Sequence, residues 1–150
     1  MAGQFVEIHK ALAAQLKARH NRPDFNYLAF PDASAGLGDH KIEVWPGSPY
    51  VDYWGSFGSG GTMDLNLRLR IETHKGDAQS AGELMCELLS VGDGAQWSVF
   101  EAVMADDTLG GTVEECVVGR EIDYEVDDET YAHVAWMQLA IIVRKSGAGV

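Results

Sequence analysis

The stretch that most constrains the fold is "MDLNLRLRIE", residues 63–72. Apolar and polar residues alternate there without exception, and this period of two is typical of a β-strand with one buried face and one wet face. The expected core positions are Met63, Leu65, Leu67, Leu69 and Ile71. We expect Arg68 and Arg70 to be exposed to solvent, to a lumen or to a neighbouring subunit. Such a strand belongs in a sheet that is covered on one side.

The rest of the chain predicts helices and further strands around this one. Apolar residues at three- and four-residue intervals indicate amphipathic helices, and alternation or β-branched runs indicate strands. Pro-Gly at 46–47 is expected to end the second strand. The expected elements, in order, are a helix over 5–19, strands over 26–30, 41–47 and 63–72, helices over 78–90 and 97–106, a strand bent around Gly119 over 112–126, and a strand over 130–145.

This order predicts one α+β domain over residues 1–150. We expect a central, mostly antiparallel sheet of about four or five strands. The N-terminal helix and a helical pair at about 78–104 should pack on it. Residues 5–144 should form the ordered core, with a frayed tail at 145–150.

The final strand is apolar on both faces of "VAWMQLAIIV", residues 134–143. Such a strand lies in the middle of a sheet or has one face against a partner subunit. His133 precedes this run and is expected to be a satisfied core or interface histidine rather than a metal ligand. Cys86 and Cys116 are expected to be buried free thiols, although a disulfide stays an alternative.

The composition argues against several function classes. A formal net charge of −12 repels phosphate backbones, so DNA binding is not expected without a basic patch. The candidates for such a patch are Lys10, Lys17, Arg19, Arg22, Arg68 and Arg70. The sequence predicts no transmembrane helix and no secretion signal, since its longest apolar run is too short and its start lacks a basic segment.

The sequence predicts no catalytic, cofactor-binding or metal-binding residue. Its histidines are scattered without ligand spacing, and no nucleophile elbow is present. Acidic turns at 106–107 and 127–129 lack the alternating ligands of a calcium loop. The pair Gly110-Gly111 follows a helix and precedes a strand, the reverse of a phosphate loop. We interpret it as a helix stop with one left-handed glycine, hence as a connection.

The unusual stretch is "SPYVDYWGSFGSGG", residues 48–61, which interleaves aromatic rings with Gly, Ser and Pro. Two interpretations stay open: an interaction surface, or a loop whose rings cap the protein's own core. We expect the loop at 46–61 to be mobile alone and ordered on assembly. The candidate interface residues are Trp45, Tyr50, Tyr53, Trp54, Phe57 and Trp136.

The succession of these segments resembles the tail terminator (tail completion) proteins of long-tailed bacteriophages. The matching features span roughly 5–144 and lie in their order, not in one motif. They are an N-terminal "ALAAQL" helix, the "WPGSPYVDYWGSFGSGG" loop and following strand, a helix ending "ELLS", "SVFEAVMADDTLGG" leading into "TVEECVV", and the final "YAHVAWMQLAIIV" strand. The acidic segment "REIDYEVDDETY" and the loop at 31–40 depart from the family pattern.

The resemblance implies an α+β structural protein of the virion without enzymatic activity. It implies a homo-oligomeric ring, commonly a hexamer, that caps the tail tube and offers the joining surface to the head-side connector. DNA would pass through this ring without specific binding. The protein would lie at the head–tail junction of the virion, and in the host cytoplasm during assembly. The alternatives are another neck component, such as a head-completion or stopper protein, and a small-molecule- or peptide-binding module.

Overall fold

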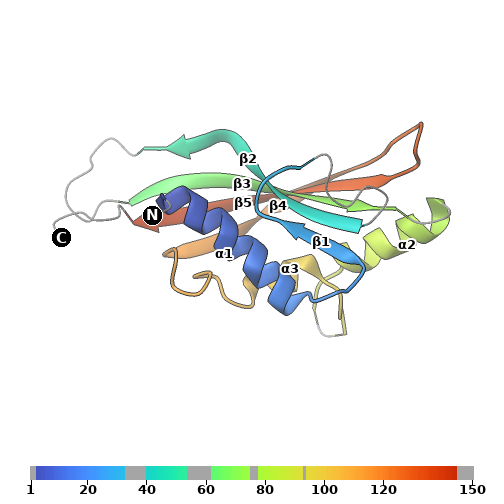
Figure 1. Cartoon of the computed structure of the whole chain (residues 1–150), viewed down its shortest axis with the longest axis horizontal. Coiled ribbons are helices and arrows are strands. Elements are labelled where there is room, and N and C mark those ends of the chain that lie inside the picture. Colours follow the sequence, from blue (N-terminus) through green and yellow to red (C-terminus); the bar gives the residue numbers. More distant parts are fainter. Residues whose placement is uncertain (1–2, 33–39, 54–61, 75–77, 93, 145–150) are drawn as a thin grey trace.

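The chain forms a five-stranded sheet and three helices in the residues that the computed structural model describes (Figure 1). The described residues are 3–32, 40–53, 62–74, 78–92 and 94–144. The elements are α1 (Gln4–Arg19), β1 (Phe25–Leu28), β2 (His40–Asp52), β3 (Thr62–Thr73), α2 (Ala78–Leu89), α3 (Val99–Met104), β4 (Glu115–Val126) and β5 (His133–Arg144). The predicted α+β domain and its order of elements are confirmed. The frayed tail expected at 145–150 lies outside the described residues.

The strand order in the sheet is β1-β2-β3-β5-β4. Only β1 pairs in parallel, with the first residues of β2, and every other pairing is antiparallel. β3 and β5 pair along their whole length, from Thr62 opposite Arg144 to Thr73 opposite His133. β5 is therefore an interior strand, which is one of the two alternatives that its apolar sequence left open, while β4 forms one edge of the sheet.

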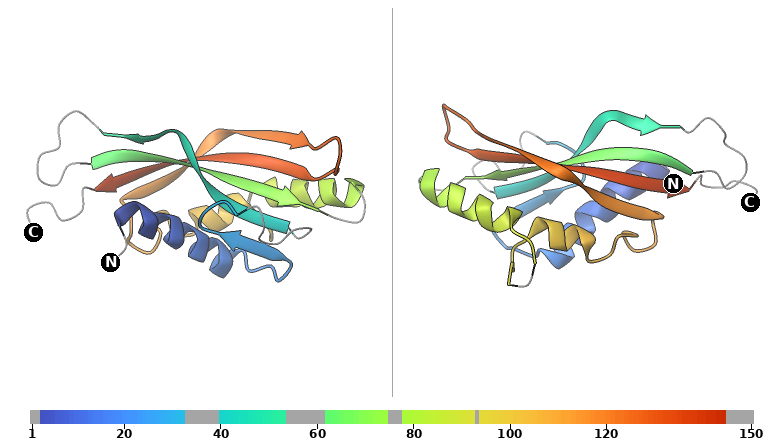
Figure 2. Two further views of the ribbon diagram at one scale, coloured as in Figure 1. Left: turned by 45° about the horizontal axis from the view of Figure 1, so that its top comes forward. Right: turned by 180° about the vertical axis from the view of Figure 1, so that it is seen from behind.

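All three helices lie on one face of the sheet (Figure 2). The alternating residues of β3 point toward them, and Leu65, Leu67, Leu69 and Ile71 are completely buried. From α1, Ile8, Leu12 and Leu16 meet this face and are equally inaccessible. Each such aliphatic side chain contributes about 1.5–3 kcal/mol on burial, so this layer is the main source of stability. The apolar stripe of α2 is confirmed at Ala81, Leu84, Met85 and Leu88.

Two buried histidines anchor α1 to the structure around it. His9 Nδ1 donates to the Ala29 carbonyl at 2.8 Å, and its Nε2 accepts from the Tyr50 hydroxyl at 3.0 Å. His20 Nε2 donates to the Trp97 carbonyl at 3.0 Å, and its Nδ1 accepts from the Tyr27 hydroxyl at 2.6 Å. Each ring uses one donor and one acceptor, which suits the neutral imidazole. Burial lowers the pKa of both histidines.

A side-chain amide from α1 also fixes the end of α3. Gln15 Nε2 donates to the carbonyls of Ala102, Val103 and Asp106 at 3.1, 2.7 and 3.1 Å. Carbonyls at a helix C-terminus have no partner within the helix, so this amide satisfies them. At the other end, the Ser98 hydroxyl caps α3 by accepting from the Glu101 N–H.

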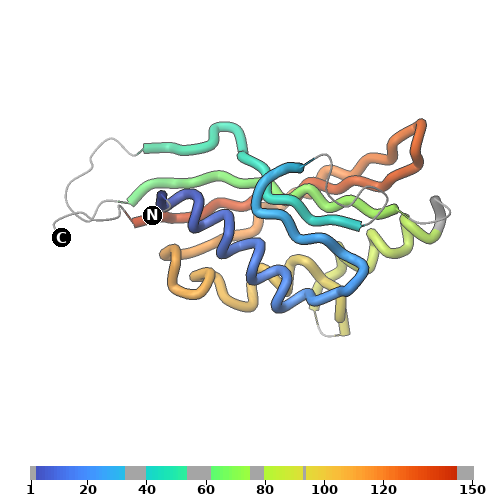
Figure 3. Tube along the Cα trace, viewed as in Figure 1, coloured from blue at the N-terminus to red at the C-terminus, as the bar shows by residue number. Residues whose placement is uncertain are grey.

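The predicted end of the second strand at Pro46-Gly47 is wrong. β2 continues to Asp52 with a shift of register between Pro46 and Val51, visible as a kink in the trace (Figure 3). β1 pairs only with the start of β2, so Pro46 lies where β2 is an edge strand and its missing N–H costs no ladder bond. Gly47 is required there, because a Cβ would lie 2.7 Å from the Asn66 carbonyl oxygen.

The helix-stop reading of the Gly pair is also wrong, although the pair does connect α3 to β4. α3 ends at Met104, and a turn organised by Asp106 follows it. The Asp106 carboxylate accepts from the Thr108 and Gly110 N–H groups and from the Thr108 hydroxyl. Both glycines have positive φ, at 72° and 85°, where only one was expected.

The two cysteines differ, contrary to the expectation that both are buried. Cys116 on β4 is fully buried, whereas Cys86 lies on the exposed side of α2, and both are free thiols. Burial raises the pKa of the Cys116 thiol to about 12. Consecutive residues of an α-helix point about 100° apart around its axis, so Cys86, next to the buried Met85, lies off the buried stripe.

Candidate functional site

The candidate site lies on the face of the sheet that carries no helix, which we call the open face. Its side chains are the alternate residues of the strands whose other residues form the core, as the register fixes. On β2 and β3 these side chains pair across the strands as Lys41 with Glu72, Glu43 with Arg70, and Trp45 with Arg68. Opposite charges directly across two strands stabilise each other.

An aromatic and cationic cluster occupies the middle of the open face. The rings of Trp45 and Trp136 meet edge to face with centroids 5.3 Å apart. The guanidinium carbon of Arg68 lies 4.4 Å from the Trp136 ring centroid, and that of Arg70 lies 5.8 Å away. Arg68 Nε also donates to the Pro46 carbonyl at 3.2 Å. Both arginines are half-buried against a ring, so the prediction that they are simply exposed was incomplete.

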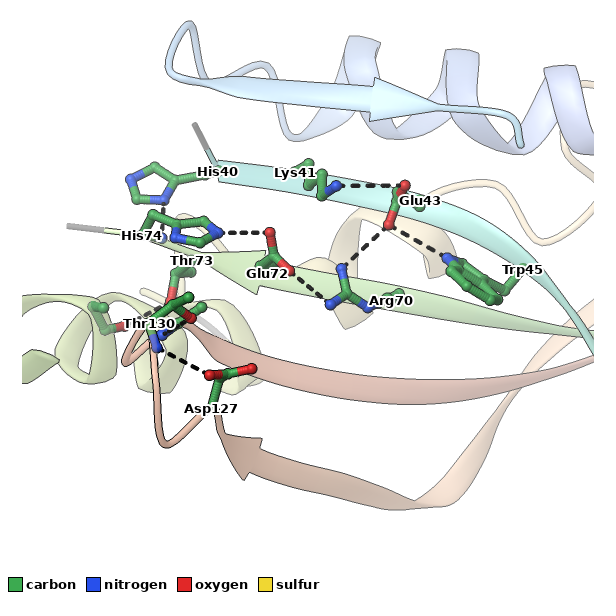
Figure 4. Close-up of polar contacts among 12 residues, drawn as sticks. His40, Lys41, Glu43, Trp45, Arg70, Glu72, Thr73, His74, Asp127 and Thr130 are labelled. Carbon is green, nitrogen blue, oxygen red and sulfur yellow. Dashed lines mark hydrogen bonds and ion pairs between the residues drawn. The ribbon is translucent and has the colours of Figure 1, made fainter. Parts of the chain in front are cut away.

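A buried carboxylate, Glu43, joins this cluster to a network of charges (Figure 4). Its side chain is 3 % exposed. The carboxylate accepts from Arg70 at 3.3 Å, from the Trp45 indole N–H at 3.4 Å and from the Asp32 N–H at 3.2 Å. The Lys41 ammonium lies 3.7 Å from it. These donors replace hydrogen bonds to water that the carboxylate loses on burial.

Glu72 extends the network toward the end of the sheet. Its carboxylate pairs with Arg70 at 2.7 Å and accepts from His74 Nε2 at 2.6 Å. The backbone N–H of His74 donates to His40 Nδ1 at 3.0 Å. Burial opposes ionisation of Glu72, but the hydrogen bonds from His74 and Arg70 outweigh it and lower its pKa. Arg70 therefore bridges two carboxylates, Glu43 and Glu72.

A cavity of about 640 Å³ lies over these charges. Its floor comes from β2, β3 and β5, and its walls come from the segment after β1 and from the turn between β4 and β5. The lining residues are Pro31, Asp32, Lys41, Glu43, Trp45, Arg70, Glu72, His74, Asp127, Thr130, Ala132 and Val134. This volume is in the range of small-ligand sites, but the lining is far more charged than is usual for them.

The acidic turn beside the cavity is organised by its own backbone. Asp127 Oδ1 accepts from the N–H groups of Glu129 and Thr130 at 2.8 and 2.9 Å. These bonds lower the pKa of Asp127. Among the described residues, no group of three His, Cys, Asp or Glu side chains is placed to hold a metal ion.

The predicted interface residues divide into four groups. Trp45 and Trp136 come together on the open face. Tyr50 instead packs edge to face on Phe5 and bonds His9, so this ring caps the protein's own core. Tyr53 is 62 % exposed. Trp54 and Phe57 lie outside the described residues, as does the second half of the loop predicted at 46–61. The prediction of a loop is wrong for residues 46–52, which belong to β2.

His133 is buried, as predicted, but it is only half satisfied. Its Nδ1 bonds the Tyr124 hydroxyl, while its Nε2 makes no hydrogen bond within the described part of the chain. The ring packs on α2, where a Cβ at Gly82 would lie 3.0 Å from its Cε1. The histidine is thus a packing element between β5 and α2.

Sequence reasoning missed the charged network beneath the cavity. Lys41 and Glu43 occupy the polar positions of an alternating strand, which is also the pattern of an ordinary solvated face. The only signal was the succession of opposite charges on two neighbouring strands. No protein-family model matches this sequence, and a search of curated proteins found no significant match. In the described ranges, no helix has the length and hydropathy needed to cross a membrane.

Proposed function

We propose that the protein is a structural virion component, a tail terminator that forms a homo-oligomeric ring on the end of a tail tube. The observation that carries this proposal is the edge of the sheet along β4, which is unprotected from residue 119 onward. β4 has twelve residues, and every residue from 119 to 131 is exposed. A long edge strand offers unpaired backbone groups to another chain, and proteins usually cover or shorten such strands.

Apolar side chains accompany this open edge. Ile122, Tyr124 and Val126 alternate along β4 and are 37 %, 42 % and 41 % exposed. Val117, which is 42 % exposed, lies opposite Ala140 on the open-face side and is not part of this row. A contiguous row of exposed apolar residues on an edge strand favours an interaction surface over a solvated one.

The resemblance to tail terminator proteins is the reason for proposing a ring as the kind of assembly. The segments that resemble tail terminators occur in one compact sheet domain in the same order. The aromatic and cationic cluster on the open face adds a second surface of the composition found at protein interfaces, with Trp and Arg at its centre. In this proposal the ring contacts the tube protein on one side and the head-side connector on the other, and DNA passes through it.

The test measures assembly with and without the tube. Light scattering and negative-stain images should show a closed ring at tens of micromolar protein, or on tubes built from the tube protein of the same genome. A mass of monomer or dimer under both conditions would exclude the ring. Binding to the connector but not to tubes would favour the alternative of another neck component.

The cavity over Glu43 favours a second candidate, a module that binds a small molecule or peptide. Its volume and buried charged floor are the specific observations. This candidate predicts that the melting temperature of the protein rises when a ligand is added. Arg70→Met, which removes the cation shared by two carboxylates, would abolish that rise while leaving a ring intact.

A further inference from the structure

We propose that the acidic edge strand β4 of one copy docks against the basic outer stripe of α1 of the next copy. This inference rests on the proposed ring and names the two unlike surfaces that would close it. Rings require head-to-tail contacts between different surfaces, whereas a two-fold dimer uses one surface twice. The partner is therefore a second copy of this chain.

The charges of the chain are strongly segregated. Of 23 acidic residues, eight lie between 114 and 129, where Arg120 is the only cation. Of 11 Lys and Arg residues, four lie between 10 and 22. In a protein of net charge −12, a local excess of cations stands out as a surface to which acidic side chains are attracted.

The basic residues of α1 form one stripe. Lys10, Ala14 and Lys17 are exposed and follow one another at intervals of four and three, on the side opposite Ile8, Leu12 and Leu16. Neither lysine makes an ion pair within the described residues. The small side chain of Ala14 between them allows a strand to approach the helix closely, with the lysine stems beside it.

The acidic side chains of β4 are equally uncompensated. Asp123 and Glu125 lie opposite Trp136 and Val134 in the register and thus project on the open-face side of the edge. Both are exposed, and neither pairs with a cation among the residues described. The apolar row of Ile122, Tyr124 and Val126 projects on the other side of the same edge. A helix lying along this edge contacts both rows.

The two surfaces lie on opposite sides of the molecule. β4 forms one end of the strand order, whereas α1 packs against β1 and β2 and against α3, which lies between α1 and β4. α1 is in front in Figure 1, whereas β4 passes in front when the molecule is seen from behind in the right view of Figure 2. One copy can thus engage two neighbours at once, which a ring requires.

Paired charge reversals test this interface. The acid-reversed variant is Asp123→Lys with Glu125→Lys, and the base-reversed variant is Lys10→Glu with Lys17→Glu. Each variant places like charges across every contact, so assembly should need about tenfold more protein or fail entirely. An equimolar mixture should assemble again as alternating copies, and so should the chain that carries all four reversals.

The control is Asp52→Lys with Asp107→Lys, two exposed acids outside both surfaces. Like the acid-reversed variant, it moves the net charge from −12 to −8, since each reversal adds two positive charges. If overall repulsion limited assembly, both variants would assemble better than the natural chain. The proposal requires normal assembly of the control, loss in the acid-reversed variant, and unchanged melting temperatures for all monomers.

The outcomes separate the two proposals. If the natural chain forms rings and both reversed variants form them equally well, the interface proposed here is wrong and the ring stands. If rings are lost in each variant but neither the mixture nor the fourfold variant recovers them, the two surfaces do not face each other. If the natural chain forms no ring even on tail tubes, the proposed function itself fails.

Discussion

The two faces of the β3–β5 strand pair use the same backbone in opposite ways. On the helix-covered face, Leu67 lies opposite Leu139, and both are almost wholly inaccessible. At the next pair of residues in the register, Arg68 lies opposite Gln138 on the open face. The first face stabilises the fold through apolar burial. The second carries charged and aromatic side chains that interact with one another on the surface of the sheet.

The open face is nevertheless not an ordinary wet surface. Glu43 and Lys41 on it are as buried as many core residues, at 2 % and 7 % exposure. Lys41 and Glu43 pair with each other along β2, and Arg70 on β3 pairs with Glu43. The desolvation of each ion offsets much of this attraction. The two faces are therefore destabilised by opposite substitutions. Introducing a charge destabilises the helix-covered face, whereas removing a charge destabilises the network on the open face.

The largest expected effect comes from placing a charge in the core. Leu67→Asp should abolish soluble folding, because an unpaired buried carboxylate costs several kcal/mol or more. Gln138→Asp, an exposed change on the open face of the adjacent strand, should fold normally. Soluble yield and far-UV circular dichroism measure both. Equal losses in the two variants would mean that the faces have been assigned wrongly.

The next effect comes from removing a charge from the network. Arg70→Met leaves Glu43 and Glu72 without their shared cation and should lower the free energy of unfolding by about 3 kcal/mol. Adding Glu43→Gln to that variant should recover part of the loss, since one buried charge is then removed with its partner. Urea denaturation measures the cycle. Strict additivity of the two changes would show that the pair is not coupled.

A smaller loss of stability is expected on mild acidification, and we attribute it to two histidines on the helix-covered side of the sheet. The pKa values of His9 and His20 are lowered below the usual 6.5, so the folded state binds fewer protons than the unfolded chain. Their contribution is complete above about pH 6.5 and is lost as the pH falls through the folded pKa values. Thermal melts from pH 7 to 5 should show falling stability.

The carboxylate of Glu72, on the open face, should lose its contribution to stability in a different pH range from the two histidines. Its pKa is lowered from the usual 4.5, so its stabilisation persists through this range and is lost only at more acidic pH. The variant His9→Gln/His20→Gln should flatten the loss between pH 7 and 5, even if it is less stable throughout. An unchanged slope would show that other groups take up the protons.

The smallest effect is expected at the aromatic cluster. Arg68→Ala removes a cation over Trp136 and a hydrogen bond to the Pro46 carbonyl and should cost about 0.5–1 kcal/mol. Arg68→Lys keeps the charge but not the planar group and should recover only part of this. Chemical denaturation measures both. A loss as large as that of Arg70→Met would place Arg68 within the buried network.

The sequence by itself determined the order of the elements, the facing of β3 and the apolar character of both faces of β5. Each of these follows from a local period, because alternation of side chains or their recurrence every three or four residues is already present in the chain. The apolar stripe of α2 and the bend of β4 around Gly119 also follow from local sequence patterns. There the register shifts between Val118 and Ile122, as the sequence predicted.

Only the tertiary structure decided which polar residues are buried and where the second strand ends. Pro46 is tolerated because β1 stops short of it, a fact about a neighbour that no local pattern contains. Likewise, Glu43 and a solvated glutamate look identical in sequence. Glu43 is buried because Arg70 on β3, the backbone of Asp32 after β1 and Lys41 on its own strand surround it, and only the folded sheet brings Arg70 and Asp32 to it. Local periodicity fixes which way a side chain points, but the environment it meets depends on contacts between segments far apart in the chain.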